Sequence, residues 1–104
     1  MSDLVLILST ASTRAEAERI AETLVAEKLA ACVQLSAIDS VYRWQGEVEH
    51  GAEIRISIKT RATLTEAVES RIKALHSYDV PQIVVVPIAG GSADYLGWIA
   101  AETE

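Results

Sequence analysis

Leu4-Val5-Leu6-Ile7-Leu8 is an unbroken apolar run, and Ile83-Val84-Val85-Val86 is a second one. A strand with one face in water alternates apolar and polar residues, whereas a continuous run indicates burial on both faces. The helices expected in this chain can cover only one face of a sheet. A second copy of the chain is the simplest cover for the other face, so the two runs predict an assembly.

Length and composition indicate a single compact domain over residues 1–104. Half of the residues are hydrophobic and 23% are charged, which suffices for one core. The formal net charge of −6 argues against nucleic acid or an anionic membrane as partner, because both require clustered Lys and Arg. No apolar stretch approaches the roughly 20 residues of a membrane span, and the N-terminus lacks a signal-peptide pattern. A cytoplasmic location is therefore expected.

The expected elements are strand, helix, strand, strand, helix, strand and a short final helix. Thr13 and Thr63 each stand three residues before a glutamate, Glu16 and Glu66, a spacing typical of reciprocal helix N-caps. The last helix is expected to begin at Ser92. This order predicts an α+β, ferredoxin-like βαββαβ fold with an additional C-terminal helix and both main helices on one face of an antiparallel sheet. Glu16 is expected on the solvated face of the first helix.

A long hairpin is predicted from Cys32 to Trp44 and from Glu47 to Lys59, with a turn at Gln45-Gly46. Its thirteen-residue outward strand spans about 43 Å at ~3.3 Å per residue. A domain of this length is only about 33 Å across. Part of the hairpin must therefore project, and docking onto a neighbouring subunit is the expected outcome.

The apolar residues of the outward strand change face along its length. Val33 and Leu35 share one parity, whereas Ile38, Tyr42 and Trp44 share the opposite one. A single extra residue in a strand produces such a change. The pattern therefore predicts a β-bulge within residues 37–39.

Five sequence blocks carry a family resemblance. They are LAACVQL from Leu29, SVYRWQGEVE from Ser40, Lys59-Thr60, HSYDVPQI from His76 and DYLGW from Asp94. In order and spacing they resemble the CutA family of divalent-cation tolerance proteins, over nearly the whole chain. The resemblance implies a homotrimer without enzymatic activity, whose hairpins pair between subunits as in an assembly similar to the nitrogen-regulatory PII proteins.

The resemblance also implies a weak site for a divalent cation such as copper. Family members reported to bind copper carry Cys where this chain has Ser9 and a second His where it has Leu75, so His76 alone remains of that ligand set. Tight copper or zinc sites need three or four suitable donors. Weak metal binding centred on His76 is therefore expected.

A small ligand is the other expected occupant of the clefts between subunits. Besides His76, the residues expected there are Lys59, Tyr78, Trp44 and Gln82. An aromatic such as Trp44 can stack on a ligand, although subunit packing explains it more simply. Lys59 can bind an anion or pair with a carboxylate of another subunit.

Two other functions remain open at this stage. One is a PII-like signalling module that senses a metabolite and presents its hairpin to a partner protein. The other is a small hydrolase with Cys32 and His76 as a nucleophilic pair. Cys32 lies in an apolar strand, however, and free cysteine is among the most buried residue types, so a core position is expected for it.

Overall fold

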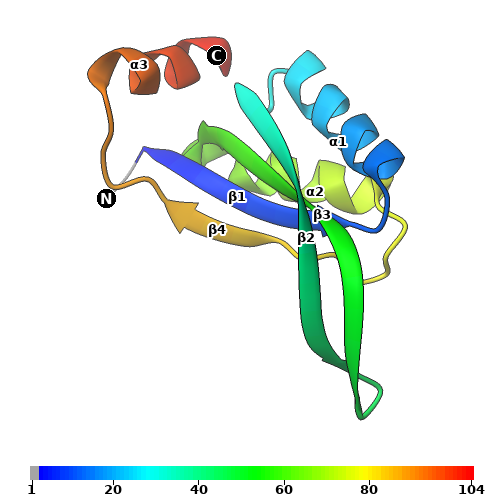
Figure 1. The fold of residues 1–104 in the computed structure, drawn as a ribbon. Coiled ribbons are helices and arrows are strands. Elements are labelled where there is room, and N and C mark those ends of the chain that lie inside the picture. The colour runs from blue at the N-terminus through cyan, green and yellow to red at the C-terminus, as the bar shows by residue number, and fades with distance from the viewer. Residues whose placement is uncertain (1–2) are drawn as a thin grey trace.

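The computed structural model describes residues 3–104 as a four-stranded antiparallel sheet with three α-helices. The sheet order is β2-β3-β1-β4 (Figure 1). The elements are β1 (Leu4–Ala11), α1 (Arg14–Ala26), β2 (Cys32–Trp44), β3 (Glu47–Arg61), a 3₁₀ turn (Ala62–Leu64), α2 (Thr65–Leu75), β4 (Val84–Pro87) and α3 (Ala93–Glu102). This is the predicted ferredoxin-like order with the additional C-terminal helix. None of the described helices is long and apolar enough to span a bilayer.

The core lies between one face of the sheet and helices α1 and α2. Its fully buried members alternate along the strands and recur at helical spacing, as expected for one covered face. They include Ile7, Ile56 and Ile58 from the sheet and Ile20, Leu24, Val68 and Ile72 from the helices. On β1 the residues that alternate with Ile7 and its buried neighbours are Leu4, Leu6 and Leu8. They are half-buried and point to the other face of the sheet. The first unbroken run thus has apolar residues on both faces of its strand.

Helix α3 covers part of that second face. Lys59 and Arg61 alternate with the buried residues Ile58 and Thr60, so they point away from α1 and α2. Arg61 nonetheless hydrogen-bonds to the last turn of α3. The expectation that the chain's own helices cover only one face is therefore wrong at this end of the sheet, because α3 returns over it.

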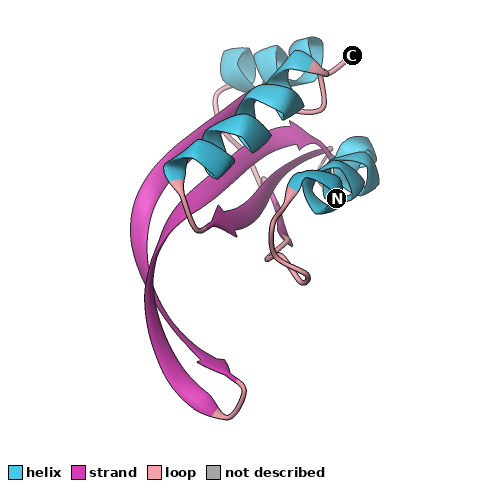
Figure 2. Cartoon of the chain, turned by 90° about the vertical axis from the view of Figure 1, so that its right-hand side faces the viewer, coloured by secondary structure: helices cyan, strands magenta, loops and turns pink. Residues whose placement is uncertain are grey.

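The hairpin projects as an arm from the rest of the chain. The molecule measures 44 × 25 × 22 Å, and the tip of the arm lies at the opposite end from α3 (Figures 1 and 2). Gln45 and Gly46 form its two-residue turn with φ of 49° and 82°. Both values are left-handed, which is the geometry that continues the twist of two paired strands.

The predicted β-bulge is wrong. Strands β2 and β3 pair without interruption from Cys32 opposite Lys59 to Trp44 opposite Glu47. The apolar residues change face because the surroundings change: near the core, Val33 and Leu35 pack beneath the helices, and farther out the arm has left them. The sequence pattern therefore reflects the loss of the helix cover along the arm and not a defect in the backbone.

The helix starts follow the predictions in part. Thr13 Oγ1 accepts a hydrogen bond from Glu16 N at 3.2 Å, but the Glu16 carboxylate turns elsewhere. Ser92 caps α3 as expected, through Tyr95 N. The cap predicted at Thr63 is wrong, because residues 62–64 form a 3₁₀ turn and α2 begins only at Thr65.

Candidate functional site

His76 lies directly after α2, and its side chain is fully buried. Its Nδ1 accepts a hydrogen bond from Tyr78 N at 3.0 Å, and its Nε2 lies 2.6 Å from the carbonyl oxygen of Thr10. A backbone N–H must donate and a carbonyl must accept, so the neutral ring carries its proton on Nε2. Both ring nitrogens are thus engaged by backbone, and a metal can reach Nδ1 only by displacing Tyr78 N.

Glu16 is the second buried member of this site, with 6% of its surface exposed. Its Oε2 accepts a hydrogen bond from Ser77 N at 2.7 Å and lies 3.8 Å from His76 Nδ1. Burial raises the pKa of Glu16, but the hydrogen bonds from Ser77, together with the charge of Arg19, outweigh it, so the pKa lies below its ordinary value. The expected solvated position of Glu16 is wrong.

Tyr78 connects this site to the base of the arm. Its ring centroid lies 4.6 Å from that of His76, and its hydroxyl donates to Glu53 Oε2 at 3.2 Å. Burial raises the pKa of Tyr78, and the charge of Glu53 raises it further. The phenol therefore stays protonated at neutral pH and serves as a donor. We refer to His76, Glu16, Tyr78 and Glu53 as the hairpin-base cluster.

A groove of about 230 Å³ lies beside this cluster, between the start of α1 and the base of the arm. Glu53 belongs to both, and Arg14 and Asp39 add charges of opposite sign to the groove lining. Sequence reasoning did not select Glu16, although it stands four and eight residues before the buried Ile20 and Leu24 and so shares their helix face. This spacing in the sequence indicates that Glu16 is buried with Ile20 and Leu24.

The other predicted ligand residues lie apart from the cluster. Lys59 Nζ hydrogen-bonds to Tyr95 OH at 3.2 Å and lies 5.1 Å from the centre of that ring. Trp44 is at the exposed tip of the arm, and Gln82 is exposed just before β4. Within residues 3–104 the structure therefore brings together His76 and Tyr78, but not Lys59, Trp44 or Gln82.

The cysteine does not form a pair with His76. Cys32 is half-buried opposite Lys59, on the sheet face away from α1 and α2, so its expected core position is wrong. His76 contacts Thr10, which pairs with Arg55. Arg55 and Lys59 are about 13 Å apart along β3 at ~3.3 Å per residue. The geometry gives no support to a Cys32–His76 nucleophile.

The donors in one chain do not form a metal centre. No group of three or more His, Cys, Asp and Glu side chains in the described part of the chain could hold a metal ion. Ser9 is fully buried, and its Oγ has no hydrogen-bond partner among these residues. A multidentate site would require donors from a second chain.

Comparison with known proteins gives consistent results. Residues 5–102 match the family described as CutA1 divalent ion tolerance protein. The divalent-cation tolerance protein CutA of Thermus thermophilus is 43% identical over 104 residues, which cover 99% of each chain. The chloroplastic Protein CutA 1 of rice is 40% identical over 95% of this chain, which spans only 56% of the rice protein.

A solved structure extends the likeness to the fold. The structure described as the periplasmic divalent cation tolerance protein CutA from Archaeoglobus fulgidus superposes with a TM-score of 0.95 at 40% identity. The match covers 97% of this chain and 99% of that one. Identity at this level over nearly the whole chain, together with the close superposition, shows common descent. The chain belongs to the CutA1 family of divalent ion tolerance proteins.

Proposed function

We propose that this chain acts in divalent-cation tolerance as a homotrimer, and that it binds a metal ion or a small ligand in clefts between subunits. The observation that carries the proposal is the uncovered arm. Val41, Trp44 and Val48 are 65%, 59% and 60% exposed, beyond the reach of α1 and α2. Val48 pairs with Arg43, so it shares a face of the arm with Val41, whereas Trp44 lies on the opposite face. The arm thus exposes apolar side chains on both faces, and a docked neighbouring chain would cover them.

The sheet edges support the same arrangement. β2 and β4 are the two edge strands, and all four residues of β4 are exposed. Unpaired edges of this kind readily pair with another chain. An arm that docks on a neighbour would cover its own apolar residues and one of these edges at the same time.

The hairpin-base cluster is the part of the cleft that one chain supplies. Its His76 Nδ1 and Glu16 Oε2 are separated by 3.8 Å and offer one nitrogen and one oxygen donor. A cation such as Cu(II) or Zn(II) would have to displace Tyr78 N from Nδ1, which weakens its binding. Donors from a neighbouring arm would complete the coordination, since two protein ligands are fewer than tight sites use.

A PII-like signalling module is the second candidate. The exposed tip with Trp44 favours it, because aromatic residues are enriched where proteins recognise each other. In this case the tip would remain outside the trimer contact and bind a different protein.

The cellular location also stays a prediction. The cytoplasm is expected for this chain, whereas the rice relative is described as chloroplastic and that of Archaeoglobus as periplasmic.

The test combines assembly with metal binding. Sedimentation equilibrium should give three subunits, and calorimetric titration with Cu(II) and Zn(II) should give weak, exchangeable binding that His76→Gln abolishes. His50→Gln is the matched control, because His50 is exposed on the arm and lies outside the cluster. A folded monomer at micromolar concentration would refute the assembly. Nanomolar affinity that survives His76→Gln would refute the choice of ligand.

A further inference from the structure

A second groove, of about 440 Å³, lies between α3 and the ends of β1 and β3. This volume is within the range of small-molecule pockets. Leu4 in this groove pairs with Arg61, whereas Thr10 beside the hairpin-base cluster pairs with Arg55. The two sites are therefore about 20 Å apart along β1 at ~3.3 Å per residue.

The walls of this groove are mainly apolar. Leu4, Ala62, Leu96 and Ala100 line it, together with Gly97. A Cβ added at Gly97 would meet nothing within 4 Å, so the groove is open at that point of the helix. Such a surface accommodates a short aliphatic chain.

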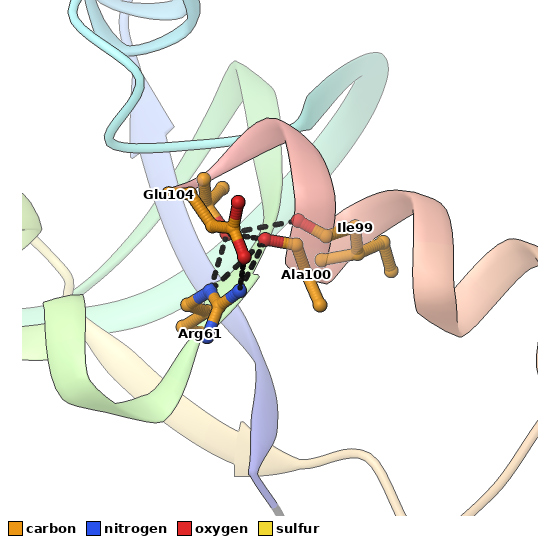
Figure 3. A network of polar contacts seen from close by, with 5 residues as sticks. Arg61, Ile99, Ala100 and Glu104 are labelled. Atoms are coloured by element: carbon orange, nitrogen blue, oxygen red, sulfur yellow. Dashed lines mark hydrogen bonds and ion pairs between the residues drawn. The ribbon is translucent and has the colours of Figure 1, made fainter.

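Arg61 supplies one positive charge to the lining. Figure 3 shows its polar contacts with Ala100 and Glu104 at the end of α3. Its Nε and Nη2 donate to the carbonyl oxygen of Ala100 at 3.0 and 2.6 Å, and Nε also donates to Thr103 Oγ1 at 3.2 Å. These bonds hold the guanidinium in place beneath the end of α3. None of them uses Nη1, which leaves part of the donor fork for a further acceptor.

The Glu104 carboxylate forms only a weak ion pair with Arg61. Glu104 Oε1 lies 3.4 Å from Nη2, and the Glu104 side chain is 75% exposed. Exposed ion pairs at such a distance contribute little to stability. A carboxylate that arrived with an apolar body in the groove would therefore compete effectively with Glu104.

We propose that this groove binds a small aliphatic monocarboxylate, with Arg61 as the anchor for its carboxylate and Glu104 as an intramolecular competitor. The apolar walls select the aliphatic body, and the fork of Arg61 suits a carboxylate. Asp3 also lines the groove and is exposed, so a second negative charge on the ligand is disfavoured. This site is separate from the proposed cleft at the hairpin base.

The experiment is an NMR titration of this chain in its native assembly, with hexanoate as the probe and 1-hexanol as its neutral counterpart. Saturable chemical-shift changes should appear at Leu96, Gly97 and Ala100. The affinity for 1-hexanol should be lower than that for hexanoate by a factor of about ten or more, since 1-hexanol cannot make the charge-assisted bonds. Equal affinity for hexanoate and 1-hexanol, or no saturable binding, would overturn the proposal.

Two substitutions test the groove and the competitor. Gly97→Leu should fill the groove and lower hexanoate affinity at least about tenfold, whereas Ala101→Leu, at an exposed position of the same helix, should leave it unchanged. Glu104→Gln removes the competing charge and should raise affinity about threefold. Unchanged affinity in Gly97→Leu would place the binding elsewhere, and weaker binding in Glu104→Gln would refute the competition.

Discussion

The helix-covered half of the sheet and the hairpin arm share two strands but differ in what stabilises them. Near the core, Ile56 and Ile58 are completely buried by α1, α2 and neighbouring strands of the same chain. In the arm, Val41, Trp44 and Val48 are mostly exposed although the pairing of the strands continues unbroken. Hydrogen-bonded register therefore extends beyond the region that one chain can bury, and in the proposed assembly a neighbouring chain would cover the rest of the arm.

The largest expected effect comes from an aspartate placed in the core, and the same change on the arm should be much milder. Ile56→Asp places an unpaired carboxylate in the core and should destabilise the chain by about 3–5 kcal/mol or more, leaving it unfolded or aggregated. Val48→Asp should preserve the secondary structure of the helix-covered half but weaken the proposed association, because Val48 lies on the arm outside the chain's own core. Circular dichroism checks both, and an unfolded Val48→Asp protein would contradict the distinction.

A somewhat smaller effect concerns the arm alone. Trp44→Ala should weaken the proposed trimer by about 2 kcal/mol or more, as expected for an aromatic anchor in an interface. Sedimentation equilibrium at several concentrations measures the shift toward monomer. The melting temperature should also fall on dilution, since association stabilises the folded chain by mass action. Arg43→Ala, an exposed neighbour of Trp44, is the control and should have little effect.

The junction between core and arm should respond to pH through Glu16. Its folded-state pKa lies below the ordinary 4.5, so its contribution to stability is complete above pH 4.5 and is lost as the pH falls through the folded pKa. Glu16→Gln should cost about 1 kcal/mol at pH 7, because the amide oxygen can still accept from Ser77 but the charge that strengthens this bond is removed.

Urea denaturation at pH 3 to 7 measures both proteins. The difference in free energy of unfolding between the original chain and Glu16→Gln should shrink as the pH falls. A constant difference across this range would refute the role of the Glu16 charge. Glu18→Gln, an exposed glutamate of the same helix, should leave stability nearly unchanged at every pH.

The smallest expected effect lies in the core. Ser9→Ala should stabilise the chain by about 1 kcal/mol, because Ser9 Oγ is buried without a partner among residues 3–104 and costs free energy there. Thr60→Val provides the opposite case, since Thr60 Oγ1 donates to the Leu29 carbonyl at 2.7 Å. That change should destabilise the chain. Thermal melts that rank the two variants in the reverse order would contradict this assignment.

The fold could be predicted because spacing reports burial. Apolar alternation placed Ile56 and Ile58 on one strand face, and the Thr13 and Ser92 caps marked two helix starts. The same signals do not report which surface provides the burial. The change of face at Ile38 was therefore interpreted as a bulge.

The candidate site was less predictable for a related reason. The sequence identified His76 and Tyr78 but not their contacts with Glu16 and Glu53, which come from residues 60 and 25 positions away. Local patterns contain no information on such distant pairs. Cys32 has apolar neighbours in sequence, yet it faces the side of the sheet away from the main core, next to Lys59.

The unbroken pairing of β2 and β3 also has a mechanical consequence. The pairing continues from the core to the tip, and Tyr78 attaches the loop after α2 to Glu53, so the base near Glu53 would be the fulcrum of any rotation of the arm. Glu53 lies seven positions along the chain from Gly46 in the turn, about 23 Å at ~3.3 Å per residue. A rotation of about 10° at the fulcrum would then displace the tip by about 4 Å. Small rearrangements at the base are thereby amplified into movements at the tip as large as an interatomic contact distance.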